Sequence, residues 1–162
     1  MRERNYYGSM MVEMGDADAL ISGITRNYRA TIKPALEVIG REDGVSKVAG
    51  MYIMRTKKGT LFLADTTINL DPTAEEIADL SAMIAKKVKQ FKVKPRVALL
   101  SYSNFGSTRT KDSKKMAEAA EILKAEYPNL VVDGEIQGDF ALDAEKMQRT
   151  FPFSPLAEES AN

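Results

Sequence analysis

A short apolar run that opens through a polar loop into a helix constrains the fold of this chain more than any other feature. Residues 97–100 are apolar and have the pattern of a strand buried in a sheet, and residues 111–126 have the pattern of a helix. The segment between them, 101–108, holds hydroxyl and amide side chains and a glycine. In an open α/β sheet such a loop lies at the carboxyl edge of the strands, where ligands bind. The run therefore predicts an α/β fold with a binding loop.

The same loop is a candidate anion site. A helix N-terminus presents free backbone N–H groups and favours a negative charge such as a phosphate. Three lysines near the start of the predicted helix add positive charge: Lys111, Lys114 and Lys115. The alternative is an ordinary strand-to-helix loop whose Ser and Thr residues only cap the helix.

Predicted strands and helices alternate along the chain. Two β-rich runs, 45–56 and 60–66, are joined by Lys57-Lys58-Gly59, which indicates a hairpin because the glycine can supply the positive φ of the turn. The alternation predicts a largely parallel sheet, to which the hairpin adds an antiparallel part. The remaining predicted elements are helices over 5–14, 30–39, 71–91 and 143–149 and short strands over 19–22 and 130–132.

Two local features refine this outline. Pro34 falls in the first turn of the helix predicted over 30–39, where a missing N–H costs little. After the short strand predicted over 130–132, residues 133–139 form a polar segment bounded by two glycines, Gly134 and Gly138.

The composition excludes several classes of site. The chain has 162 residues, which suits one domain, and it contains no cysteine and no histidine. Disulfides, thiol nucleophiles, histidine bases and the usual zinc ligand sets are therefore excluded. Lys plus Arg and Asp plus Glu both total 23, so no global basic field attracts nucleic acid or an anionic membrane. With no segment of signal-peptide or membrane-spanning character, a cytoplasmic protein is the simplest interpretation.

Five motifs occur in one order along the chain, and each is similar to a signature of the phosphate acetyltransferases. This resemblance implies a three-layer αβα fold like that of the isocitrate and isopropylmalate dehydrogenases. The motifs are Gly-Asp-Ala-Asp-Ala-Leu-Ile-Ser-Gly at 15–23, Thr-Ile-Lys-Pro-Ala-Leu at 31–36, Phe-Leu-Ala-Asp with Asn-Leu-Asp-Pro-Thr within 62–73, Ser-Tyr-Ser at 101–103, and Asp-Gly-Glu-Ile-Gln-Gly-Asp at 133–139.

Two segments depart from the acetyltransferase pattern. Residues 24–29 read Ile-Thr-Arg-Asn-Tyr-Arg where that family has small Ser/Thr-rich sequence, and residues 104–107 read Asn-Phe-Gly-Ser. Both variants resemble the acetyltransferase-like C-terminal domain of hybrid NADP-dependent malic enzymes. For such a domain the resemblance implies a regulatory module that senses acetyl-CoA. Malate decarboxylation, NADP and a divalent metal are then expected in an N-terminal domain that is absent here.

The resemblance also implies that these residues are part of a longer protein. In the acetyltransferases, the Ser, Arg and Asp assigned to acyl transfer lie in a Leu-Ser-Arg-Gly…Asp segment that would follow residue 162. We therefore expect residues 1–162 to form a single α/β lobe with no catalytic residues and no acetyltransferase activity of its own. Apolar surface left by missing strands, and the dimers of the family, predict self-association into a dimer or higher oligomer.

The candidate ligand residues lie in two loops, and we expect acetyl-CoA to bind in a cleft lined by 23–31 and 101–108. Guanidinium groups suit the pyrophosphate or 3′-phosphate of CoA, although exposed arginines on a solvated loop are an equally good interpretation of the first loop. No metal site is expected, since Asp16 and Asp18 have no further ligands nearby. The candidates are Arg26, Arg29, Thr31, Ser101, Ser103, Asn104, Ser107 and Thr108.

Three hypotheses for function stay open. The first is an acetyl-CoA-sensing regulatory domain of a malic enzyme. The second is a phosphate acetyltransferase that moves an acetyl group between CoA and phosphate. The third is a structural domain that only holds an oligomer together.

Overall fold

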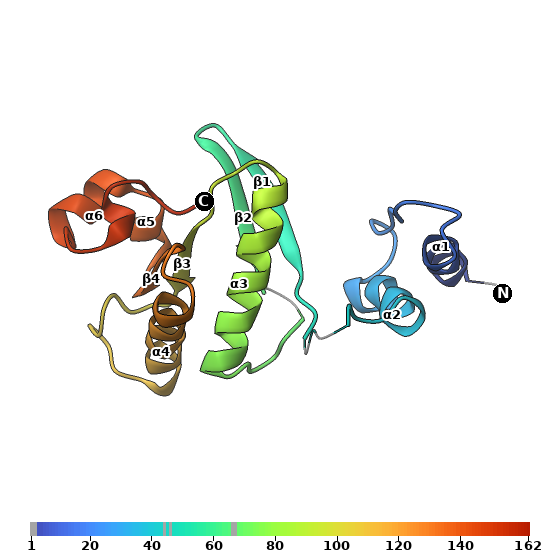
Figure 1. Ribbon diagram of the computed structural model, residues 1–162, viewed down its shortest axis with the longest axis horizontal. Coiled ribbons are helices and arrows are strands. Elements are labelled where there is room, and N and C mark those ends of the chain that lie inside the picture. The colour runs from blue at the N-terminus through green and yellow to red at the C-terminus, as the bar shows by residue number, and fades with distance from the viewer. Residues whose placement is uncertain (1–2, 44, 46, 66–67) are drawn as a thin grey trace. The chain divides into compact units, whose positions relative to one another are not determined.

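The computed structural model describes residues 3–43, 45, 47–65 and 68–162 of the chain (Figure 1). The chain divides into two compact units, Met1–Val48 and Ala49–Asn162. The described part of the first unit holds only helices, and all the strands of the described residues lie in the second.

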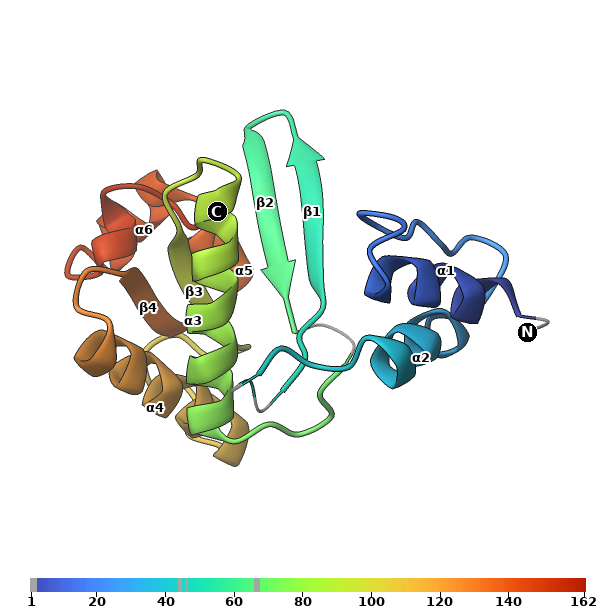
Figure 2. The same cartoon turned by 45° about the vertical axis from the view of Figure 1, so that its right-hand side comes forward.

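Two helices, α1 (Arg4–Glu13) and α2 (Tyr28–Val38), pack against each other in the first unit (Figure 2). Both confirm helices predicted from the sequence. Helix α2 begins at Tyr28 because the Asn27 side chain caps it there, accepting a hydrogen bond of 2.8 Å from the Ala30 N–H. Pro34 consequently lies inside the helix, so its predicted place in the first turn was wrong.

The strand predicted over 19–22 is absent, and that prediction was wrong. An apolar run becomes a strand only where a neighbouring strand completes its ladder, and among the described residues no strand pairs with this segment. Instead, Ile21 is 98% exposed, Leu20 lies against Gly8 of α1, and the Ser22 hydroxyl donates a hydrogen bond of 2.8 Å to Asn5 Oδ1.

The predicted hairpin is confirmed in the second unit. Strands β1 (Met51–Thr56) and β2 (Gly59–Ala64) pair antiparallel, and Gly59 has the positive φ of +140° that the turn required. Strand β1 begins at Met51 rather than at residue 45, because its partner strand ends at Ala64, opposite Met51. Residues 46 and 66 of the predicted runs lie outside the described residues.

A parallel pair of strands forms the centre of the second unit. Strands β3 (Arg96–Leu100) and β4 (Val131–Ile136) are connected through α4 (Lys111–Glu126), and α3 (Ala74–Gln90) packs beside α4 (Figure 1). The described strands thus form two two-stranded sheets. The predicted mixed α/β fold is confirmed in this form.

Successive residues of β3 and β4 point to opposite faces of the pair, and apolar side chains occur on both faces. Helical elements therefore pack on both faces. One core cluster contains Leu99 and Val132 and belongs with α3 and α4. The other contains Ile136 and packs against the C-terminal elements α5 (Gly138–Ala141), α6 (Ala144–Thr150) and the 3₁₀ turn η1 (Pro155–Ala157).

Strand β4 extends further than the sequence predicted, since it includes Asp133, Gly134 and Glu135. Both carboxylates are buried, and each has partners on other elements that make its burial tolerable: Lys124 for Asp133, and the 101–108 loop for Glu135. The predicted end of this strand at residue 132 was therefore wrong.

The last residue of the chain lies beside β3. Asn162 accepts a hydrogen bond of 3.0 Å from the Arg96 N–H through Oδ1 and donates its own N–H to the Arg96 carbonyl at 3.1 Å. Within the described part of the chain, no helix combines the length and the apolar character needed to span a bilayer.

Candidate functional site

The polar loop predicted from the sequence runs from the end of β3 to the start of α4, alongside the end of β4. The Ser101 N–H donates to the Ile136 carbonyl at 2.9 Å, and the Gln137 side chain donates to the Tyr102 carbonyl at 2.7 Å. At the far end of the loop, Thr110 caps α4 and accepts a hydrogen bond of 3.3 Å from the Ser113 N–H. The loop is thus tied to the sheet at one end and to a helix at the other.

Glu135 is the centre of the contacts between the loop and β4. Its side chain, on a residue only 3% exposed, accepts hydrogen bonds at Oε1 from the Ser103 hydroxyl at 2.8 Å and from the Gly106 N–H at 2.6 Å. Its backbone carbonyl accepts from the Phe105 N–H at 2.9 Å. Glu135, a single buried residue, therefore accepts hydrogen bonds from three loop residues, Ser103, Phe105 and Gly106.

Ser103, Asn104 and Ser101 already use their side chains within the fold. The Ser103 hydroxyl is fully buried, donates to Glu135 and accepts from the Thr108 N–H at 3.0 Å. Asn104 Oδ1 accepts from the Gln137 N–H at 2.8 Å, and Ser101 Oγ accepts from the Ser103 N–H at 3.2 Å. These three predicted ligand residues shape the loop in the structure described here.

Ser107 and Thr108 are the exposed serine and threonine of the loop. Ser107 Oγ accepts from the Asn104 N–H at 3.0 Å and lies 3.2 Å from Ser103 Oγ. Within the described residues, the Thr108 hydroxyl makes no hydrogen bond. Of the five loop residues predicted from the sequence, these two present their side chains to solvent.

The turn of the loop is built on left-handed backbone. Phe105 and Gly106 have φ values of 46° and 83°, a conformation that a glycine adopts freely and a phenylalanine does not. The Phe105 ring packs edge-to-face on Phe151 and Phe153, with centroid distances of 5.0 Å to each. Aromatic packing therefore offsets the backbone strain at this position.

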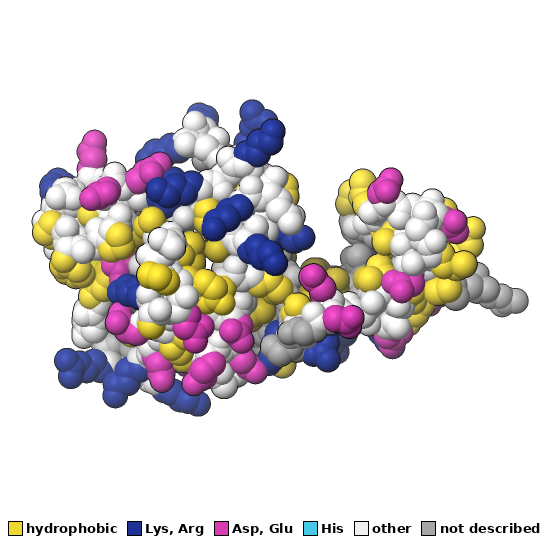
Figure 3. Space-filling model, viewed as in Figure 1, with side chains coloured by type: hydrophobic (Ala, Val, Ile, Leu, Met, Phe, Trp, Pro, Cys, Tyr) yellow, Lys and Arg dark blue, Asp and Glu magenta, His cyan; other side chains and the backbone are white. Residues whose placement is uncertain are grey.

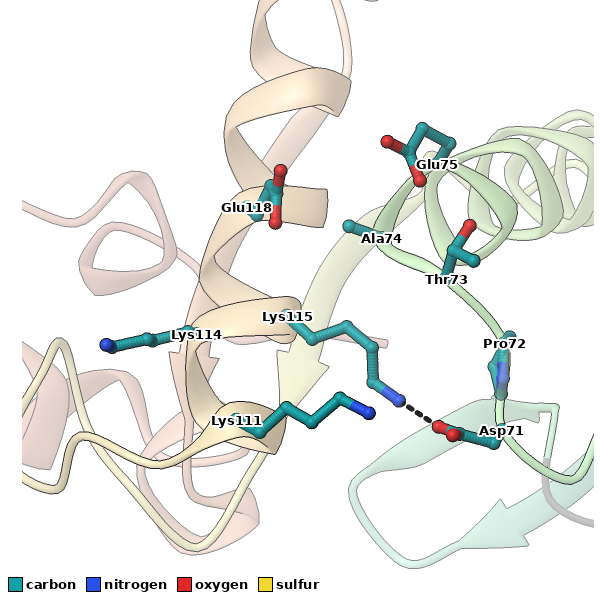
Figure 4. A pocket seen from close by; sticks show the side chains of 9 residues that line it. All are labelled: Asp71, Pro72, Thr73, Ala74, Glu75, Lys111, Lys114, Lys115 and Glu118. Atoms are coloured by element: carbon teal, nitrogen blue, oxygen red, sulfur yellow. Dashed lines mark hydrogen bonds and ion pairs between the residues drawn. The ribbon is translucent and has the colours of Figure 1, made fainter.

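A pocket of about 400 Å³ lies between the N-terminal ends of α3 and α4 (Figure 4). The ammonium of Lys115 is 2.5 Å from Asp71 Oδ1 across it, and Lys111 also reaches toward Asp71, whereas Lys114 extends away. The hydrogen bond from Lys115, helped by its charge and that of Lys111, lowers the pKa of Asp71. The full lining is Asp71, Pro72, Thr73, Ala74, Glu75, Lys111, Lys114, Lys115 and Glu118.

Of the lysines predicted beside the loop, Lys115 is paired with a carboxylate, and Glu75 and Glu118 also line the pocket. Figure 3 shows basic and acidic side chains side by side along the lower part of the second unit. Because the pocket lining carries both signs, its charge alone selects neither an anion nor a cation. Among the described residues, no group of three acidic side chains is arranged to hold a metal ion.

The other three predicted site residues belong to the first unit. Arg26 and Arg29 are exposed, one before α2 and one in its first turn. The Thr31 hydroxyl donates to the carbonyl of Asn27, the N-cap residue of the same helix, at 3.1 Å. The cleft expected between the two loops stays a prediction.

Sequence reasoning missed Glu135 and Gln137 as residues that build the site. Both lie in the polar 133–139 segment, which was noted as a motif without a role. The available signal was the position of Glu135 beside the apolar Ile136. A glutamate buried at such a position needs hydrogen-bond donors from elsewhere in the fold.

Sequence comparisons agree with the motifs. The whole chain, residues 1–162, matches the family described as phosphate acetyl/butaryl transferase. It is 39% identical over 148 residues to an NADP-dependent malic enzyme of Haemophilus influenzae, a match that covers 91% of this chain and 20% of that protein. It is 36% identical over 154 residues to the phosphate acetyltransferase of Bacillus subtilis, which covers 95% of this chain and 48% of that protein.

A comparison of folds gives the same result. The EutD phosphotransacetylase from Staphylococcus aureus superposes with a TM-score of 0.79 at 30% identity, covering 97% of this chain and 49% of that one. The chain thus spans about a fifth of the malic enzyme and about half of either phosphotransacetylase. The domain it carries occurs in both classes of protein.

Proposed function

The chain belongs to the phosphate acetyl/butaryl transferase family, and we propose that within it this chain serves as an acetyl-CoA-sensing domain of a malic enzyme. The supporting observation is the 101–108 loop, which leads from a buried strand to a helix N-terminus and keeps Ser107 and Thr108 exposed. Phosphate oxygens of a CoA thioester would accept hydrogen bonds from these hydroxyls and from the helix N-terminus behind them. Identity to malic enzymes of 39–42% supports the choice of parent protein.

Ligand binding is the test of this proposal. We would titrate acetyl-CoA, CoA and acetyl phosphate into the full-length protein by calorimetry and measure malate turnover at increasing acetyl-CoA. Thr108→Val keeps the shape of the side chain but removes its donor, and a lost charge-assisted contact should weaken acetyl-CoA binding about tenfold or more. Malate turnover without acetyl-CoA should stay the same.

The control is Lys57→Ala in the hairpin turn, which should change neither readout. Arg26→Ala and Arg29→Ala test the first-unit candidates in the same way, with an expected loss of about ten- to hundredfold in acetyl-CoA affinity. Wild-type acetyl-CoA sensitivity in all three site variants would contradict the proposed site.

Acyl transfer is the second candidate function. It is favoured by the match to phosphate acetyltransferases over nearly the whole chain. The discriminating assay is formation of acetyl phosphate from acetyl-CoA and phosphate by the full-length protein. Activity above a heat-inactivated control would make this chain part of a transferase.

Self-association accompanies either function in our proposal. The middle residues of β1, Tyr52, Ile53 and Met54, are each about half exposed, and apolar edge strands favour pairing with other chains. Sedimentation of the full-length protein should show a dimer or larger species, and Ile53→Lys should weaken it. A monomer at tens of micromolar, roughly where modest interfaces are populated, would contradict this.

The proposed fold of the complete protein is the three-layer αβα arrangement. Helices on both faces of the β3–β4 pair support it, as does the match to about half of a phosphotransacetylase. A structure of the full-length protein should then show further strands continuing this sheet.

A further inference from the structure

We propose that Glu135 is a positioning residue that holds the 101–108 loop in its binding conformation. Ser103, which is hydrogen-bonded to both Glu135 and Thr108, extends this effect to Thr108. This inference rests on the proposed function, because it assigns a role within the same loop. It gives a role to Glu135, which neither the loop motif nor the ligand chemistry singles out.

The hydrogen bonds form a continuous path from β4 to the exposed end of the loop. Glu135 Oε1 accepts from the Ser103 hydroxyl at 2.8 Å, and Ser103 Oγ in turn accepts from the Thr108 N–H at 3.0 Å. The same carboxylate oxygen accepts from the Gly106 N–H at 2.6 Å. The carboxylate thus fixes the middle of the loop directly and its exposed end through one hydroxyl.

Burial makes this hold specific. Ser103 is fully buried and Glu135 is 3% exposed, so water does not replace either partner when one is lost. The loop needs such a hold, because its turn at Phe105 and Gly106 uses left-handed backbone that a free chain rarely adopts.

Hydrogen exchange measures this hold without any ligand. In the full-length protein, Glu135→Ala should make the Gly106 and Thr108 amides exchange about tenfold faster or more, while amides in the middle of α4 stay protected. Glu135→Gln retains a carbonyl oxygen that can accept the same two bonds and should restore most of the protection. Glu126→Ala, an exposed glutamate at the end of α4, is the control and should leave the loop unchanged.

Acetyl-CoA affinity, measured on the same variants, connects the hold to function. We expect Glu135→Ala to weaken binding about tenfold and Glu135→Gln to bind nearly as the wild type does. Unchanged loop exchange in Glu135→Ala would overturn the inference. Failure of Glu135→Gln to restore protection would overturn it as well, because the residue would then act through its charge on the whole fold.

Two further outcomes separate this inference from the proposed function. Suppose that loop exchange is faster in Glu135→Ala, while both Glu135→Ala and Thr108→Val bind acetyl-CoA as the wild type does. This result would support the positioning role of Glu135 and contradict the proposed ligand site. If Glu135→Ala does not fold, Ser103→Ala carries the test, because it breaks the path to Thr108 and leaves the Gly106 bond in place. Protection of the Thr108 amide must then fall more than that of Gly106, and equal protection in both would overturn the inference.

Discussion

The ammonium of Lys124 lies 2.9 Å from Oδ1 of Asp133, and this pair joins a side chain that is 40% exposed to one that is 4% exposed. The same lysine lies 2.9 Å from the exposed Glu121 one turn earlier in α4. Burial by itself lowers the pKa of Lys124, but its hydrogen bonds and the charges of Asp133 and Glu121 outweigh burial and raise it. This ion pair thus links α4 to β4, and its carboxylate has almost no access to water.

Removing this lysine should destabilise the fold. Lys124→Met keeps most of the apolar stem but leaves Asp133 buried, and among the described residues only the Gly134 N–H then donates to its Oδ1. We expect a loss of about 2 kcal/mol in the free energy of unfolding, measured by chemical denaturation. Glu121→Gln removes the exposed partner instead and should cost less than about 0.5 kcal/mol. Equal losses in the two variants would show that burial of Asp133 is not what matters.

Gly134 should tolerate no side chain. Its φ is +153°, and an added Cβ would lie 2.7 Å from the Leu99 carbonyl oxygen and 2.8 Å from Leu99 Cβ, so the clash is with backbone in the neighbouring strand. We expect Gly134→Ala to lower the free energy of unfolding by about 3 kcal/mol or more, measured by thermal and denaturant unfolding. Gly138→Ala is the matched control, since nothing lies within 4 Å of that position. A Gly134→Ala protein as stable as the control would refute the packing of β3 against β4.

The Asp71–Lys115 pair should be visible in a pH titration. Lys115→Met removes the main cause of the lowered pKa of Asp71, so that pKa should rise toward its ordinary value of 3.8. Because the folded-state pKa lies below the unfolded one, the pair stabilises the fold above about pH 4, and this contribution is lost as the pH falls through the folded-state pKa. NMR of the Asp71 carboxyl carbon measures the shift. Lys114→Met is the control, and a shift as large as that of Lys115→Met would contradict the geometry of the pocket.

Elements that carry their own local signals could be predicted from the sequence. Helix α3 begins at a capping box in which the Thr73 hydroxyl accepts from the Glu76 N–H at 3.2 Å and Glu76 Oε2 accepts from the Thr73 N–H at 3.0 Å. The hairpin was equally local, with Gly59 at its turn. The short apolar run at 19–22 and the polar end of β4 depended on partners far away in the sequence, so a local pattern misjudged both.

In the candidate site, too, some features followed from local sequence and others depended on distant residues. The chemistry of the 101–108 loop and its place before α4 followed from residue order alone. Which hydroxyls face solvent did not, because Ser103 is buried by a bond to Glu135, 32 residues further along the chain. Phe105 in left-handed backbone was likewise invisible in the sequence, since its strain is offset by rings near the C-terminal end.

That strain gives the loop an unusual order of substitution effects. Phe105→Ala keeps a Cβ in left-handed backbone and removes the ring contacts with Phe151 and Phe153, so it should cost about 2 kcal/mol, below the range for fully buried rings. Phe105→Gly loses the same contacts but relieves the strain, and should be more stable than Phe105→Ala by about 1 kcal/mol. In ordinary backbone the order is the reverse, because glycine loses more conformational freedom on folding. Denaturant unfolding of the two variants decides it: if Phe105→Ala is the more stable, the turn does not have the left-handed geometry described here.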